Sequence, residues 1–155
     1  MTAFEIDLDS LLRMAAAVAA GGAIGFNRDI HGKPTGIRAH ALVAFGAAIL
    51  VIAASPHYIG PNDPAASSRV IQGIVAGIGF LGAGAILRAR EGLRVFHLTT
   101  AASLWATTGV GVLCGLGAVT LAGLATVLVL AVLIVGQWLD KWLYGLSGIK
   151  DDDRE

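Results

Sequence analysis

The sequence predicts an all-α integral membrane protein, a polytopic bundle of about five transmembrane helices. Of its 155 residues, 55% are hydrophobic and only 14% are charged, whereas about 25% are charged in a typical soluble domain. The mean hydropathy of +0.74 agrees with this composition. An almost continuous apolar stretch from Leu98 to Leu139 is longer than a soluble core of this size explains. Lipid is therefore expected to replace water around most of the chain.

Five segments approach the length of about 20 apolar residues that a helix needs to cross a hydrocarbon core about 30 Å thick. They cover about residues 9–26, 39–55, 70–87, 98–116 and 118–139. Helix is predicted because lipid offers no hydrogen-bond partner to an open strand. The last two segments share one uncharged stretch, which we expect to break at Gly115-Leu116-Gly117. Residues 1–145 then form a transmembrane domain, and residues 146–155 a short charged cytoplasmic tail.

The basic residues predict the orientation of the chain. With the N-terminus outside, nine of the 11 lysines and arginines lie on the inner side, namely Arg28, Lys33, Arg38, Arg88, Arg90, Arg94, Lys141, Lys150 and Arg154. Only Arg13 and Arg69 then remain outside. Because inner loops carry an excess of lysine and arginine, we expect the N-terminus outside, the C-terminus inside and an odd number of spans.

Glycines spaced four residues apart indicate close helix packing. The pairs are Gly21 and Gly25, Gly73 and Gly77, and Gly111 and Gly115, and Gly79, Gly82 and Gly84 extend the middle pair. Small residues let helix backbones approach closely in lipid, so we interpret them as packing positions within the bundle, with a dimer interface as the alternative. Residues 77–82 also match a dinucleotide-binding fingerprint, but the match lies inside a predicted span and lacks the strand and loop that such a site needs.

The two predicted inner loops gather the candidate functional residues. Arg28, Asp29, Gly36 and Arg38 lie in or beside the first loop, and Arg88 and Arg94 lie in the second. Arginine forks hold carboxylates, phosphates or the carbonyls at helix ends, which suits a fixed charge network. The alternative is that these arginines serve only membrane topology and lipid head groups.

Hydroxyl side chains follow the fourth predicted span, beginning at Thr99 and Thr100. Thr100, Ser103 and Thr107 fall on one helix face. They are interpreted as hydrogen-bonding groups that hold helices together, with a polar path for ions or water as the alternative. Arg13, at the start of the first span, is expected to extend its charge outward to the membrane surface.

Sequence motifs give no support for an enzyme, a metal site or a cofactor. The four histidines, at positions 31, 40, 57 and 97, show no metal-ligand spacing, and no acidic residue lies inside the second to fifth spans. The formal net charge is zero, which argues against binding to nucleic acid. We therefore expect a non-enzymatic protein without a cofactor.

Four sequence blocks resemble the MgtC/SapB family of bacterial inner-membrane proteins. They are GAIGFNRD at 22–29, GIRAH at 36–40, GIGFLGAG at 77–84 and LTTAASLWA at 98–106. The resemblance implies about five spans in the cytoplasmic membrane and a link to growth in low magnesium. It also implies the short form of the family, without the soluble C-terminal domain of the longer members. The family pattern falls on Arg28, Asp29, Gly36, Arg38, Gly79, Gly82, Gly84, Thr99 and Thr100.

The chain departs from that family pattern at two places. Asn27 replaces a glutamate of the usual Glu-Arg-Glu, which removes a carboxylate from the first loop, and His97 replaces a glycine. We expect a protein linked to magnesium homeostasis that acts on a membrane pump, transporter or ATPase within the lipid bilayer, and that forms a homo-oligomer. The alternative function is a transporter or channel for Mg²⁺ or another small ion.

Overall fold

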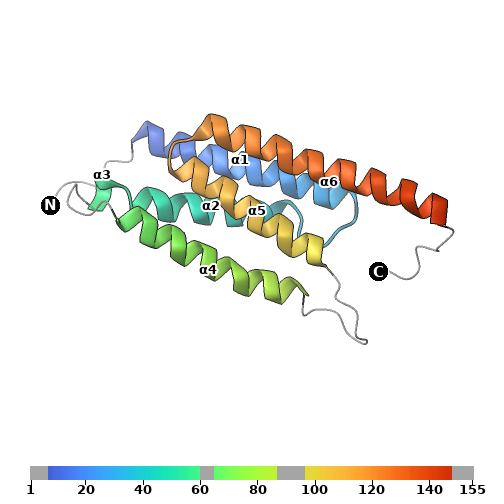
Figure 1. Cartoon of the computed structure of the whole chain (residues 1–155). Coiled ribbons are helices and arrows are strands. Elements are labelled where there is room, and N and C mark those ends of the chain that lie inside the picture. The colour runs from blue at the N-terminus through green and yellow to red at the C-terminus, as the bar shows by residue number, and fades with distance from the viewer. Residues whose placement is uncertain (1–6, 60–64, 87–96, 148–155) are drawn as a thin grey trace.

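A computed structural model describes residues 7–59, 65–86 and 97–147. Five long helices and one short helix follow one another in these ranges. Their bounds are α1 Leu8–Ile30, α2 Ile37–Ala53, α3 Pro56–Ile59, α4 Ala66–Ile86, α5 Leu98–Gly115 and α6 Val119–Ser147. The long helices run side by side in alternating directions (Figure 1), so the start of α1 and the end of α6 lie at opposite ends of the bundle.

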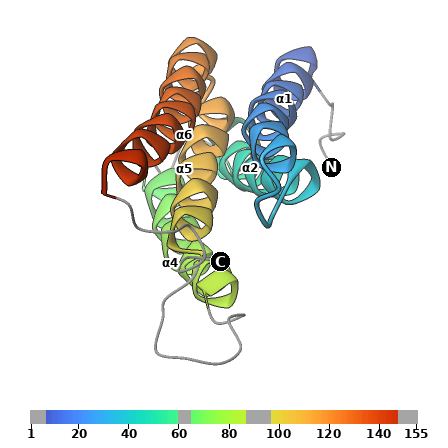
Figure 2. The same cartoon turned by 90° about the vertical axis from the view of Figure 1, so that its right-hand side faces the viewer.

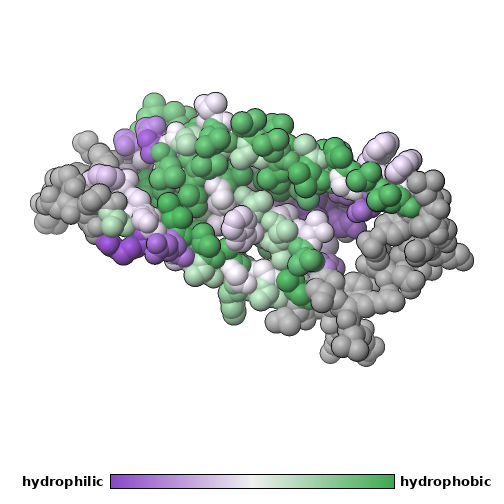
Figure 3. All heavy atoms as spheres, viewed as in Figure 1, coloured by the Kyte–Doolittle hydropathy of each residue, from purple (hydrophilic) through white to green (hydrophobic). Residues whose placement is uncertain are grey.

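The predicted fold class, an all-α membrane bundle, is confirmed. Within the described ranges, α1, α4, α5 and α6 are long and apolar enough to cross a membrane. Large apolar side chains lie on the outside of the bundle, and Figure 3 shows them over the middle of one face, with hydrophilic side chains gathered towards its ends. Such a surface is stable in lipid and costly in water. The protein is therefore a multi-pass membrane protein.

Helix α2 is as long as the span expected at residues 39–55, but it begins and ends two residues earlier, at Ile37 and Ala53. It has 17 residues, which corresponds to a length of about 26 Å at 1.5 Å per residue. It starts after Gly36, ends at Ala53 and is followed by Pro56, which begins α3. Because a proline lacks the N–H that would continue α2, the chain turns there. Helix α2 packs against α1 and α5 on one side, while Leu42 and Leu50 on the other side are exposed.

Helix α2 lies beside α1 and α5 (Figure 2), and glycine pairs on both of these neighbours pack closely against it. A Cβ atom built on Gly21 would lie 2.8 Å from the Cβ of Ala44, and one built on Gly111 would lie 2.8 Å from the Cα of Ala44. Gly25 and Gly115 lie one turn further along, against the first residues of α2 and against Val51 respectively. The backbones of α1 and α5 therefore approach α2 from two directions, at distances that only glycine permits.

Helix α5 lies at the centre of the bundle and contacts α1, α2, α4 and α6. Its buried face carries hydroxyl groups that bond to the carbonyls of the same helix. The hydroxyl of Thr107 donates to the carbonyl of Ser103 at 2.8 Å, and that of Thr108 donates to the carbonyl of Leu104 at 2.9 Å. These bonds satisfy the buried hydroxyl groups without a partner from another helix.

The break between α5 and α6 falls at the expected tripeptide. Gly117 has a φ of +82°, and its N–H bonds to the carbonyl of Cys114, while the N–H of Ala118 bonds to the carbonyl of Leu113. This pattern is a Schellman motif, which satisfies the last carbonyls of α5 and reverses the chain.

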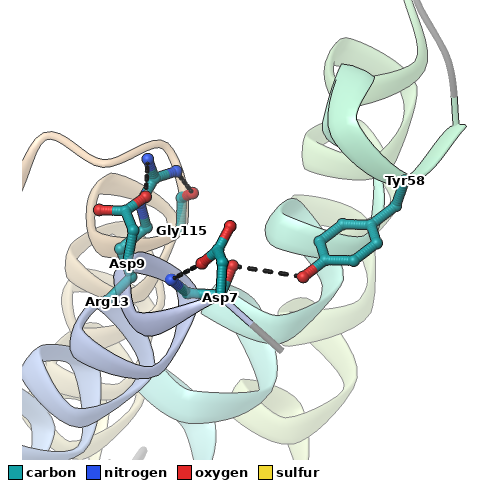
Figure 4. A network of polar contacts seen from close by, with 6 residues as sticks. Asp7, Asp9, Arg13, Tyr58 and Gly115 are labelled. Carbon is teal, nitrogen blue, oxygen red and sulfur yellow. Dashed lines mark hydrogen bonds and ion pairs between the residues drawn. The ribbon is translucent and has the colours of Figure 1, made fainter. Parts of the chain in front are cut away.

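Arg13 holds this turn against α1, and its guanidinium reaches towards the exposed Asp9 at the start of α1 (Figure 4). Its guanidinium forms an ion pair with Asp9 and donates to the carbonyl of Gly115 at 3.3 Å. A Cβ atom built on Gly117 would lie 2.9 Å from the Cζ of Arg13. A cation at the C-terminal end of α5 also interacts favourably with the helix dipole. Arg13 therefore stabilises the end of the bundle at which α1 begins.

Replacing Gly117 by alanine is expected to destabilise the protein by about 1–2 kcal/mol, because the left-handed backbone is costly for a residue with a Cβ atom. The measurement is thermal or denaturant unfolding of the purified protein. Gly123→Ala is the control, since a Cβ there has no neighbour within 4 Å among the described residues. An equal loss of stability in both variants would contradict the role of this turn.

Candidate functional site

The end of α1 meets the start of α5 through a buried arginine. Arg28 lies in the last turn of α1 and is only 2% exposed. Its Nη2 donates to the hydroxyl oxygen of Thr100 at 2.5 Å, and its Nε has no hydrogen-bond partner among the described residues. Residues 72 positions apart in the sequence are thus joined by a bond between a charged and a neutral group.

Asp29, the neighbour of Arg28, is exposed and turns towards α2. Its carboxylate accepts the N–H of Ile37, the first residue of α2, at 2.9 Å. Gly36 lies so close that a Cβ atom there would overlap this carboxylate. A negative charge at the start of a helix is stabilising, and α2 has no cap from its own N-cap side chain. Asp29 therefore acts as the N-terminal cap of the next helix.

His40 connects α2 to the buried face of α5. Its side chain is fully buried, with Nδ1 3.1 Å from the carbonyl of Gly36 and Nε2 3.1 Å from the hydroxyl of Ser103. The same hydroxyl lies 2.8 Å from the carbonyl of Thr100. The carbonyl of Gly36 can only accept, so Nδ1 donates to it, and in a neutral imidazole Nε2 then accepts the proton of the Ser103 hydroxyl in place of the Thr100 carbonyl. Arg28, His40, Thr100 and Ser103 form one polar cluster, which we call the α1–α2–α5 cluster.

The arrangement does not suit nucleophilic catalysis, although a serine and a histidine are within hydrogen-bond distance. Both side chains are buried, and the histidine Nδ1 contacts a backbone carbonyl where catalytic triads place a carboxylate. In the described ranges, no group of three or more histidine, cysteine, aspartate or glutamate residues could hold a metal ion. The cluster is suited to joining three helices near one end of the bundle.

A second candidate surface lies on α4, which packs mainly against α5. Ile78 is buried on the packed side, and a Cβ on Gly82 would lie 3.7 Å from Ala101. The side of α4 that faces away from α5 carries four residues at intervals of four, three and four positions, which we call the α4 glycine face. They are Gly73, Gly77, Phe80 and Gly84. Among the described residues, no atom lies within 4 Å of a Cβ built on any of these glycines, and Phe80 is 83% exposed.

Comparison with known proteins identifies the chain's relatives. A sequence model described as MgtC family matches residues 14–142, which includes most of α1 and α6 and everything between them. The chain belongs to the MgtC family. It is similar to Protein MgtC of Salmonella typhimurium (strain LT2), with 44% identity over 120 residues that make up 77% of this chain and 49% of the relative. It is also similar to Protein MgtC of Brucella abortus (strain 2308), with 46% identity over 119 residues, which are 77% of this chain and 48% of the relative.

This MgtC family member spans about half the length of the curated relatives that it matches. No solved structure gives a significant match.

The structure brings part of the predicted loop network together in this MgtC family member. Arg28 contacts Thr100, and Asp29 lies against Gly36, whereas Arg38 and Thr99 are exposed on the first turns of α2 and α5. Arg88 and Arg94 lie outside the described residues. The loop expected from residue 27 is shorter than predicted, because α1 continues to Ile30 and carries Arg28 and Asp29 on its last turn.

Sequence reasoning interpreted Ser103 as a hydroxyl that holds helices together, but it did not select His40 as a candidate for the site. A signal for His40 was present, because it lies four residues from Gly36, one helical turn away. The histidine was set aside because it lacked metal-ligand spacing, although a buried histidine equally serves as a hydrogen-bonding group.

Replacing Thr100 by valine is expected to destabilise the protein by about 1.5–3 kcal/mol, since Arg28 loses its hydrogen bond with a described residue. Thr99→Val on the exposed neighbour is the matched control and is expected to stay within about 0.5 kcal/mol. Denaturant unfolding of both variants measures the difference. Two equal values would show that the bond from Arg28 contributes nothing to stability.

Proposed function

We propose that this MgtC family protein is non-enzymatic and acts by packing a transmembrane helix of a partner protein against the α4 glycine face. The observation that carries the proposal is that Gly73, Gly77 and Gly84 have no neighbour on this face among the described residues. We assign the protein to magnesium homeostasis, in line with the resemblance described above. Its expected place is the bacterial inner membrane, with the N-terminus outside and the C-terminus inside.

The other glycine pairs of the chain support this use of the α4 glycine face. Gly21 with Gly25, and Gly111 with Gly115, each bring a helix backbone against α2. Glycine inside a helix costs about 1 kcal/mol relative to alanine, so it is favoured where it permits close packing. Helix α4 carries four glycines with no neighbour within 4 Å among the described residues. A partner helix on this face could approach the α4 backbone as closely as α1 and α5 approach α2.

The partner is proposed to be a pump, a transporter or an ATPase in the same membrane, and a homo-oligomer is the related possibility in which a second copy occupies the face. Phe80 projects from the middle of the face, and aromatic side chains beside small residues provide shape complementarity between helices. Exposed apolar side chains are ordinary on a surface that faces lipid. The partner-binding proposal is therefore supported by the spacing of the glycines on α4 and not by the hydrophobicity of this face.

A transporter or channel for Mg²⁺ is the second candidate, which the buried hydroxyl groups of α5 favour. Thr100, Ser103 and Thr107 lie along the buried face of α5, as a polar path would require. The hydroxyls of Ser103 and Thr107 lie within bonding distance of carbonyls of their own helix, which leaves less capacity to replace the hydration shell of a cation.

Ion flux distinguishes the two functions. The purified protein is reconstituted into liposomes that hold a magnesium-sensitive dye, and its Mg²⁺ uptake is compared with that of Thr107→Val and of empty liposomes. The proposal expects uptake equal to that of empty liposomes for folded and correctly inserted protein. Saturable uptake that Thr107→Val abolishes would contradict the partner-binding function and support transport.

A further inference from the structure

The α1–α2–α5 cluster contains a positive charge without a described counter-ion. Arg28 is buried, but the group that accepts its hydrogen bond is the neutral hydroxyl of Thr100. The carboxylate of Asp29 is exposed and bonded to the N–H of Ile37. The ion pair of Arg13 with Asp9 lies at the other end of α1. Burying an unpaired guanidinium costs several kcal/mol, so a compensating anion would be strongly stabilising.

The start of α5 adds positive potential at the same place. Thr100 is the third residue of α5, and the residue before the helix, His97, provides no side-chain cap. The first N–H groups of an α-helix have no acceptor within the helix, and the helix dipole places partial positive charge there. The neighbouring His40 contributes no negative charge in either protonation state. The helix end and the guanidinium therefore favour the same kind of ligand.

We propose that Arg28, the hydroxyl of Thr100 and the first-turn N–H groups of α5 bind a phosphate oxyanion. The Nε of Arg28 has no partner among residues 7–59, 65–86 and 97–147, so the guanidinium offers a planar pair of donors that matches two oxygens of one phosphate group. Helix N-termini bind phosphate for the same electrostatic reason. A lipid head group or free inorganic phosphate can supply this chemistry. The inference does not depend on the α4 glycine face.

The position of the cluster suits a phosphate at the membrane surface. Arg28 lies two residues before the end of α1, and Thr100 lies two residues after the start of α5. In a helix that crosses a bilayer, the terminal turns lie near the level of the lipid head groups. A lipid phosphate can therefore reach this end of the bundle without crossing hydrocarbon.

Ligand-induced stabilisation tests the proposal. The whole protein, delipidated in a nonionic detergent without phosphate, is titrated with sodium phosphate, or with sodium chloride at the same ionic strength, and its melting temperature is recorded by tryptophan fluorescence. A parallel titration compares phosphatidylglycerol with a diacylglycerol of the same acyl chains. We expect a saturable rise in melting temperature with a phosphate-bearing probe and none with its matched control.

Variants assign the effect to Arg28. Arg28→Met is expected to lose the rise, and Arg38→Met, which removes an exposed arginine from the first turn of α2, is expected to keep it. If Arg28→Met does not fold, Arg28→Lys serves in its place, and its half-saturating concentration is expected to rise about tenfold because lysine lacks the planar fork.

Each outcome of these titrations decides the proposal. A rise with inorganic phosphate identifies a soluble ligand as sufficient, and a rise with phosphatidylglycerol alone identifies a lipid head group. No rise in the native protein with either probe would overturn the proposal and leave water as the partner of the guanidinium. An equal rise in the native protein and in the Arg28 variant would overturn it as well.

Discussion

Replacing Gly111 by alanine is expected to reduce the free energy of unfolding by at least about 3 kcal/mol. The new Cβ would lie 2.8 Å from the Cα of Ala44 and closer still to its carbonyl oxygen. Both are backbone atoms of α2, so relief requires two helices to move apart and not one side chain to rotate. Overpacking in a dense interior costs about 1–3 kcal/mol even where side chains can adjust. Unfolding of the purified variant in detergent by heat or denaturant measures the loss.

Gly109 provides the control for this prediction on the same helix. It lies two residues away on the exposed side of α5, and a Cβ atom there has no neighbour within 4 Å among the described residues. Gly109→Ala is expected to be neutral or to stabilise the helix by up to about 1 kcal/mol, because alanine has the higher helix propensity. If the two variants lose the same stability, α2 is not packed against both α1 and α5 as described.

Replacing Gly77 by leucine is expected to abolish function while the protein still folds. The leucine side chain would occupy the middle of the α4 glycine face and prevent a partner helix from approaching the α4 backbone. Within the chain itself, no described atom lies within 4 Å of a Cβ at Gly77, so the free energy of unfolding is expected to change by no more than about 0.5 kcal/mol. The measurement is growth in low magnesium of a strain lacking this protein, with the variant at the expression level of the native protein.

Gly123→Leu on α6 is the matched variant, since it introduces the same side chain at a glycine that likewise has no described neighbour within 4 Å. It is expected to restore growth fully. Full restoration by Gly77→Leu would remove the α4 glycine face from the mechanism. Loss of growth with both leucine variants would instead point to a general effect of bulk in the membrane.

The helical architecture could be predicted from the sequence because it depends on local patterns. A helix that crosses lipid requires an apolar segment of about 20 residues, which can be counted in the sequence. The turn of the chain between α5 and α6 requires a positive φ, which Gly117 provides. The shared face of Thr100, Ser103 and Thr107 also follows from helical periodicity alone, and all three are buried. Helix ends were less accurate, since α1 continues through Asn27, where a loop was expected.

The contacts between helices could not be predicted in the same way. Three glycine pairs have the same spacing in the sequence, yet two lie against α2, whereas a Cβ built on Gly73 or Gly77 would have no described neighbour within 4 Å. Spacing defines a face of a helix, whereas the order of the helices in the bundle decides what that face meets. The bond from Arg28 to Thr100 depends on the same long-range arrangement.

Cross-linking from the centre of the α4 glycine face tests the partner-binding account most directly. A photoreactive p-benzoylphenylalanine replaces Phe80 in cells, and the same residue replaces Leu128, an exposed side chain on α6, as the control. The account predicts a defined adduct with a membrane protein, or with a second copy of this chain, from position 80 alone, and its loss when Gly77→Leu is combined with the cross-linker. No adduct from position 80, or one that forms equally from position 128 or persists with Gly77→Leu, would contradict it.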